Sequence, residues 1–114
     1  MTVQEMKALA ETTGLSTAYY EFPSGTEQAP PFLCWFFPDS NDVIADDRNY
    51  QKVERCVWEL YTDYKDFEKE ATVEAVLSGA DIVYSRDETY LDSERMHQTN
   101  YTFEVVITEA QPNG

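Results

Sequence analysis

The residues that could support chemistry are few and widely spaced in this sequence. Cys34 or Cys56 is a candidate nucleophile, and His97, the one histidine of the chain, is the candidate base. Neither cysteine has a basic cluster or a helix start beside it that would activate its thiol. Both lie in apolar stretches typical of strands. Core packing is therefore the simpler interpretation of the two cysteines.

The acidic stretch at residues 39–42 comes closest to a metal-binding motif. Asp39, Asn41 and Asp42 begin like a calcium loop. Val43 and Ile44, however, stand where a further ligand and the turn glycine belong. Zinc would need more soft ligands than two cysteines and one histidine at unrelated spacings. The sequence thus predicts no metal site and favours a solvated acidic loop.

Other catalytic motifs are also lacking. The chain has 4 glycines and no glycine-rich phosphate loop, and no Gly-x-Ser-x-Gly elbow is present. Carboxylates are so abundant that a pair of them carries no signal. We therefore expect a protein that is not an enzyme and that has no catalytic residues and no cofactor.

Charge narrows the possible partners. Acidic side chains outnumber basic ones 22 to 8, which gives a formal net charge of −14. Such a charge repels polyanions, so binding of nucleic acid or of an anionic membrane is disfavoured. Three roles stay open: meeting a basic protein surface, imitating DNA, or lining a passage to which DNA must not stick.

Composition predicts one folded domain over residues 1–114. Hydrophobic residues make up 42% of the chain and aromatic residues 14%, too many for a disordered acidic tail. Residues 1–5 have neither the basic start nor the apolar run of a signal peptide, and no stretch approaches the length of a membrane span. We expect an intracellular protein.

Two helices are predicted from their capping signals. Thr2 and Glu5 form a capping box for a helix over residues 3–13, and Gly14 stops it. Asp66 can cap a second helix that ends at Gly79.

Strands are predicted at about residues 17–22, 32–37, 50–62, 81–90 and 96–108, with a turn at 91–94. The run at 32–37 lacks polar alternation, so both of its faces should be covered. Short connections favour an α+β fold, in which an antiparallel sheet of four to five strands has two helices packed on one face.

The strand at residues 50–62 should expose a face of mixed polarity. Cys56, Trp58 and Leu60 alternate toward the core. Val53 and Val57 share the other face with Arg55, Glu59 and Tyr61, which we take as candidate interface residues.

The acid-rich connection at residues 39–49 is a second candidate for an interface or channel lining. It is longer than most strand connections, which suggests binding, although a plain solvated loop fits equally well. A segment at 86–95 of mixed charge fits a charged hairpin end better than an interface rim. The candidate residues of the connection are Asp39, Asp42, Asp46, Asp47 and Arg48.

A series of short pieces in a fixed order resembles small tail proteins of siphophages and prophages of Gram-positive bacteria. The pieces are PPFL (30–33), PDSND (38–42), YQKV (50–53), ELYTDYKD (59–66), SRDETYL (85–91), SE (93–94) and YTFEV (101–105). That group is similar to the lambda tail terminator and to tail-to-head joining (tail completion) proteins.

The resemblance implies an α+β subunit that assembles into a ring, expected to be a hexamer. Such a ring caps the finished tail tube and offers a surface to the head connector or neck protein. DNA passes through it without specific binding. The subunit would be made in the host bacterial cytoplasm and then remain in the virion tail. The resemblance brings no catalytic residue and no cofactor with it.

Two alternatives stay open. One is a neck or head completion subunit of the same particle. The other is an acidic DNA mimic that inhibits a host nucleic-acid-binding protein, which would need carboxylates spaced like phosphates on a convex surface. The acids here are spread through loops and helix starts, which argues mildly against a mimic.

Overall fold

The computed structural model describes residues 1–23, 25–26, 28–45 and 48–108, with the backbone alone for residues 43–45 and 48–51. The predicted α+β class is confirmed. Five strands form one mixed sheet in the order β1-β2-β5-β7-β6, and β3 and β4 form a separate pair. In chain order the elements are α1 (Val3–Glu11), β1 (Ser16–Tyr19), β2 (Phe32–Ser40), β3 (Val43–Ala45), β4 (Arg48–Gln51), β5 (Val53–Thr62), α2 (Phe67–Gly79), β6 (Ser85–Leu91) and β7 (Met96–Val106).

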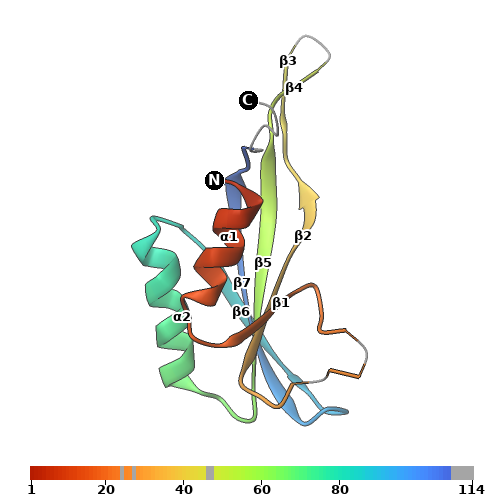
Figure 1. Cartoon of the computed structure of the whole chain (residues 1–114), viewed down its shortest axis with the longest axis vertical. Helices are drawn as coiled ribbons and strands as arrows, with labels where there is room; N and C mark the ends of the chain where they lie inside the picture. The colour runs from red at the N-terminus through yellow and green to blue at the C-terminus, as the bar shows by residue number, and fades with distance from the viewer. Residues whose placement is uncertain (24, 27, 46–47, 109–114) are drawn as a thin grey trace.

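Both helices pack on the same face of the sheet, as predicted (Figure 1). Apolar side chains of α1 and α2 meet those of β2, β5 and β7 in one cluster. Alternation on β5 is also confirmed, since Cys56, Trp58 and Leu60 are fully buried there while their neighbours Val57 and Glu59 are half-buried. The face away from the helices is called the open face below.

The helix caps follow the sequence signals. The Thr2 side chain accepts a hydrogen bond from the Glu5 N–H at 3.1 Å, and Glu5 accepts one from the Thr2 N–H at 2.8 Å. Gly14 has a φ of 78°, a left-handed conformation that glycine adopts without strain. Asp66 caps α2 by accepting a hydrogen bond from the Lys69 N–H at 3.0 Å.

The predicted antiparallel sheet is confirmed for most of its strand pairs, but the pair at one edge is parallel. β1 runs parallel to β2, with Ser16 opposite Phe32, whereas the other pairs of the main sheet are antiparallel. The first strand also ends earlier than predicted, at Tyr19, because Tyr20 has a φ of 70° and turns the chain out of the strand. The connection that follows carries the chain back along the sheet, so that β2 starts beside the start of β1.

Several other element boundaries differ from the sequence prediction, including the ends of α1 at Glu11 and of β7 at Val106. The predicted strand at 81–90 begins only at Ser85, since Asp81 has a φ of 60° and the Ile82 N–H is bonded to the Leu77 carbonyl at the end of α2. The predicted loop at 39–49 and the predicted strand at 50–62 were both wrong in part. β2 runs on to Ser40, β3 pairs with β4 across the connection, and β4 ends at Gln51 before β5 begins at Val53. The predicted turn between the last two strands is confirmed at residues 92–95.

The β3–β4 ribbon lengthens the molecule. It continues β2 and β5 beyond the helices at one end of the long axis (Figure 1). The structure measures 48 × 28 × 27 Å along its principal axes. None of the helices in the described part of the chain has the length and apolar character needed to cross a bilayer.

Candidate functional site

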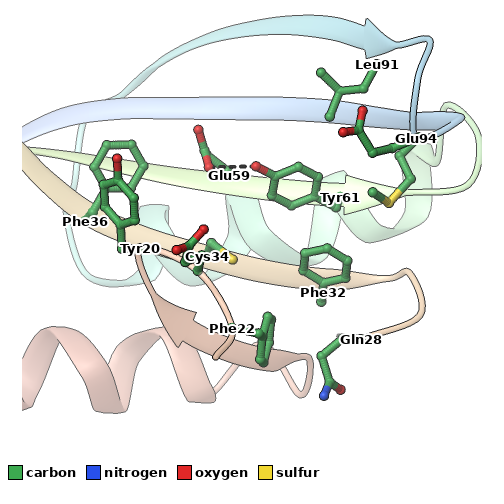
Figure 2. A pocket seen from close by; sticks show the side chains of 12 residues that line it. Tyr20, Phe22, Gln28, Phe32, Cys34, Phe36, Glu59, Tyr61, Leu91 and Glu94 are labelled. Atoms are coloured by element: carbon green, nitrogen blue, oxygen red, sulfur yellow. Dashed lines mark hydrogen bonds between the residues drawn. The ribbon is translucent and has the colours of Figure 1, made fainter. Parts of the chain in front are cut away.

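The open face of the sheet carries a groove whose lining combines five aromatic side chains with three carboxylates. The groove has a volume of about 450 Å³ and lies between the start of β2, the segment after β1 and the β6–β7 turn (Figure 2). Its walls come from segments far apart in the sequence, which only the fold brings together. The lining residues are Tyr20, Glu21, Phe22, Gln28, Phe32, Cys34, Phe36, Glu59, Tyr61, Leu91, Glu94 and Met96.

Ring contacts hold the groove in shape. The Phe32 and Tyr61 rings stack with centroids 4.7 Å apart, and Phe22 meets Phe32 edge to face at 5.4 Å. Tyr20 packs on Phe36 at 5.3 Å, although Tyr20 is 62% exposed. These contacts cover the outer face of β2 over residues 32–35, as its apolar sequence predicts.

Glu59 is the acidic group in the middle of this surface. Its carboxylate accepts hydrogen bonds from the Tyr61 hydroxyl at 2.8 Å and from the Gln98 amide at 3.0 Å. Burial raises the pKa of the Glu59 carboxyl, and these two hydrogen bonds oppose that shift. Burial together with the neighbouring carboxylate also raises the pKa of Tyr61. No ion pair among the described residues includes Glu59.

The remaining predicted residues lie toward the ribbon. Arg55 makes a two-pronged ion pair with Asp39, with Nε–Oδ1 2.8 Å and Nη2–Oδ2 2.7 Å. Asp42 accepts a hydrogen bond from the Val53 N–H at 3.1 Å, across the base of the ribbon. Arg48 begins β4, and its side chain lies outside the described part.

The structure thus brings the predicted residues together in pairs: Glu59 with Tyr61, and Asp39 with Arg55. Asp46 and Asp47 lie outside the described residues. Whether any of these residues lines a channel or an interface stays a prediction.

A second charged cluster, which the sequence patterns did not predict, lies between α2 and the last two strands. Glu70 is only 2% exposed, and its Oε1 lies 2.7 Å from Lys65 Nζ and 3.4 Å from Arg86 Nη1. Lys65 also reaches Glu88 at 2.6 Å. Arg86 also contacts Glu74 at 3.2 Å. The chain therefore pairs these carboxylates, from the buried Glu70 to the exposed Glu88, with its own cations.

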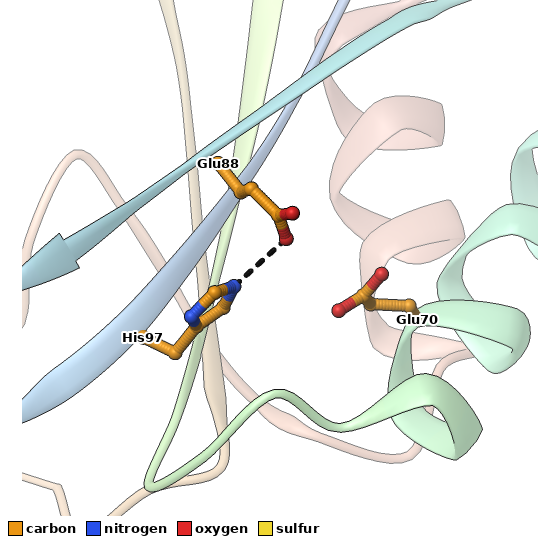
Figure 3. A group of neighbouring side chains, drawn as sticks. All are labelled: Glu70, Glu88 and His97. Carbon is orange, nitrogen blue, oxygen red and sulfur yellow. Dashed lines mark hydrogen bonds and ion pairs between the residues drawn. The ribbon is translucent and has the colours of Figure 1, made fainter.

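Glu70, Glu88 and His97 could in principle hold a metal ion. Their ligand atoms lie within 4.8 Å of one another, and His97 Nε2 lies 2.9 Å from Glu88 Oε2 (Figure 3). The Lys65 ammonium, however, already contacts both carboxylates. A bound cation would have to displace a cation of the chain itself, so we take the cluster as an ion-pair network.

The cysteines do not form a reactive pair. Cys34 faces the groove opposite Glu59, whereas Cys56 lies in the core on the other face of the sheet. Burial raises the pKa of Cys34 to about 11 and that of Cys56 to about 12. Both are free thiols that stay protonated near neutral pH.

Comparison with solved structures finds chains of similar fold. The chain is similar to a chain of the "Virion of native gene transfer agent (GTA) particle", with a TM-score of 0.64 and 19% sequence identity. The match covers 91% of this chain and 89% of that chain. This chain has the fold of a virion component. No protein-family model matches it, and no curated protein sequence matches it.

The fold likeness and the site geometry bear on different features. The likeness covers 91% of this chain at 19% sequence identity, so it describes the fold and not particular side chains. The groove, by contrast, depends on particular side chains of the segment after β1 and of the β6–β7 turn. Sequence reasoning found Glu59 and Tyr61 because alternation places them on the exposed face of β5, but it missed the groove walls, which come from distant segments.

Proposed function

We propose that this chain is a structural protein of a phage-like particle, which forms a ring on the end of the tail tube and helps join tail to head. It would act by assembly and not by catalysis. The observation that carries the proposal is the fold shared with a gene transfer agent virion chain over nine-tenths of both chains. A correspondence of that extent concerns the whole subunit and not a local motif.

Two surfaces fit such a role. The open face of the sheet leaves a half-buried, mixed-polarity surface uncovered by helices, as an assembling subunit needs. The β3–β4 ribbon extends beyond the body and could reach a neighbouring subunit or ring. The partners would be other copies of this chain, expected to form a hexamer, the tail tube protein and the head connector or neck protein.

The net charge suits a ring through which DNA moves. Each copy carries a formal charge of −14. Repulsion from several copies would keep phosphates from sticking to the wall, and screening at cellular salt would limit its range to roughly 8 Å. Under this proposal the subunit is made in the host bacterial cytoplasm and ends in the virion tail.

A neck or head completion subunit is the nearest alternative, because a virion chain of this fold fits either position. A DNA mimic is less well supported. Several of its carboxylates would have to face outward like phosphates, yet Asp39, Glu70, Glu74 and Glu88 are bound to cations of the same chain.

Co-sedimentation with assembled tubes and with isolated head connectors tests the proposal. The chain should pellet with tubes, and negative-stain images should show a ring at one tube end. Pelleting with connectors alone would instead identify the neck alternative. A chain that stays monomeric with both and binds a host DNA-binding enzyme would overturn the virion role. The tubes must be included, since a subunit of this kind can be monomeric alone and form rings only on its template.

A further inference from the structure

We propose that the aromatic groove on the open face binds a segment of another virion protein, in which a lysine or arginine stands next to an apolar side chain. The proposal deepens the proposed function and rests on it for the source of that segment. The groove, and not the ribbon or a sheet edge, would then be the site at which this subunit recognises a partner of different sequence.

The size and lining of the groove set the apolar part of the ligand. A hollow of about 450 Å³ lies at the small end of ligand-binding clefts, so it fits one or two side chains of an extended segment. The stacked Phe32 and Tyr61 rings and the perpendicular Phe22 ring offer flat and edge-on contacts to an apolar group. Ring contacts on both sides hold these side chains in place before binding, which lowers the entropic cost of association.

The carboxylates that line the groove determine the second requirement, that the ligand carries a cation. Its lining includes three carboxylates, those of Glu21, Glu59 and Glu94, and no lysine or arginine among the described residues. Glu59 accepts only neutral hydrogen bonds, from a hydroxyl and an amide. An ionised carboxylate has about four lone-pair sites, so it can accept further donors. A guanidinium or ammonium of the ligand could therefore form an ion pair with Glu59, a half-buried carboxylate that has no ion pair in the described part of the chain.

The same charges argue against a second copy of this chain as the occupant. Another copy brings 22 acidic side chains and only 8 basic ones. Of those basic groups, Arg55, Lys65 and Arg86 already form ion pairs within the chain. Two surfaces of the same negative sign repel, whereas a cationic segment is attracted to the groove.

Selection from a random peptide library on the folded wild-type chain provides the test. The enriched peptides should contain lysine or arginine beside an apolar residue. Affinity of one such peptide should fall about 10-fold or more for Glu59→Gln, the loss of one charge-assisted hydrogen bond. Glu104→Gln is the matched control, because Glu104 lies on the same sheet face outside the groove lining and loses the same charge. It should change affinity by less than about 2-fold, the range of a distant surface charge.

A double-mutant cycle locates the contact. Replacing the peptide's cation by glutamine should weaken binding to the wild-type chain and have little further effect on the Glu59→Gln variant. Circular dichroism of each variant confirms that the fold is retained. Enriched peptides without a cation, equal affinities for wild type and Glu59→Gln, or no enrichment at all would each overturn the proposal. Self-association that Glu59→Gln abolishes would overturn it too, by identifying a second copy as the occupant.

This outcome can be separated from that of the proposed function. A chain that caps tubes but selects no cationic peptide keeps its proposed function and loses this inference. A chain that ignores tubes and connectors but binds cationic peptides through Glu59 keeps the groove as a peptide site, while the tail role fails.

Discussion

Glu70 and Glu59 are two carboxylates withdrawn from water on opposite faces of the same sheet, and the chain treats them differently. Glu70, under α2, contacts the ammonium of Lys65 and the guanidinium of Arg86. Glu59, on the open face, receives hydrogen bonds from the neutral side chains of Tyr61 and Gln98 and forms no ion pair with any described residue. A carboxylate withdrawn from water without a cation is unfavourable for the free subunit. Under the proposal above, the difference separates a carboxylate that stabilises the fold, Glu70, from one that binds a partner, Glu59.

Removing the charge of Glu70, the carboxylate with ion-pair partners, should have the largest effect on stability. Glu70→Gln leaves Arg86 and Lys65 without their buried counter-charge, so the free energy of unfolding should fall by about 2 kcal/mol, less than for a fully buried pair because both cations are partly exposed. Chemical denaturation measures it. Glu68→Gln, at an exposed site in the first turn of the same helix, is the control and should have a much smaller effect. A Glu70→Gln variant as stable as the Glu68→Gln variant would remove the network from the account.

Removing the charge of Glu59 should change the unfolding free energy in the opposite direction. Glu59→Gln removes a desolvated charge while keeping an acceptor for Tyr61, so the unfolding free energy should stay the same or rise by less than about 1 kcal/mol at pH 7. Because the folded-state pKa of Glu59 is raised, its cost appears as pH rises above the ordinary value of 4.5. The advantage of the glutamine variant should therefore grow from acid toward neutral pH. A clear destabilisation at pH 7 would make Glu59 a structural residue and contradict the comparison.

Acid should weaken the interactions of Glu88 with Lys65 and His97. Hydrogen bonds from Lys65 and His97 lower the pKa of Glu88 to about 2, well below its usual value of 4.5. A carboxyl with a lowered folded-state pKa contributes stability above its unfolded value, and that contribution is lost as pH falls from about 4.5 to 2. Denaturation curves across this range should show a smaller loss for Glu88→Gln than for the wild-type chain. Parallel pH profiles for the two chains would show that Lys65 and His97 do not lower the pKa of Glu88.

The smallest effect is expected at the ion pair near the ribbon. Arg55 and Asp39 have side chains that are 47% and 55% exposed, so Asp39→Asn should lower the unfolding free energy by only about 0.5 kcal/mol. Chemical denaturation measures this change.

Neutralising Asp39, Asp42, Asp46 and Asp47 together should leave the fold intact but impair assembly or DNA passage. Particle infectivity measures that second effect. Normal infectious particles from the fourfold variant would remove this segment from the functional surfaces.

The sequence predicts well those features that depend on near neighbours. The Thr2–Glu5 capping box and the Asp66 cap form within one helical turn, and alternation along β5 places Glu59 on the exposed face. The parallel pairing of β1 with β2 depends instead on the path of the chain between them, which no local signal specifies.

The ion pairs of Glu70 could not be predicted from the sequence for the same reason. Its cations come from the segment before α2 and from β6, so the contacts exist only once α2 is packed on the sheet. An acidic residue in the first turn of a helix normally lies at the surface, where it interacts favourably with the helix dipole, so the position of Glu70 in the sequence does not indicate its burial. The groove likewise combines Phe22, Phe32 and Met96, which lie in three separate segments.

The most direct test of the proposed role is tail tube growth in the presence of the purified chain. The account predicts that growth stops when the wild-type chain is added, with a ring of this protein on one end of each tube. Glu59→Gln should give rings less efficiently if the groove meets the tube, while Glu104→Gln should behave as wild type. Tubes that keep growing beside a chain that never joins them would contradict the account.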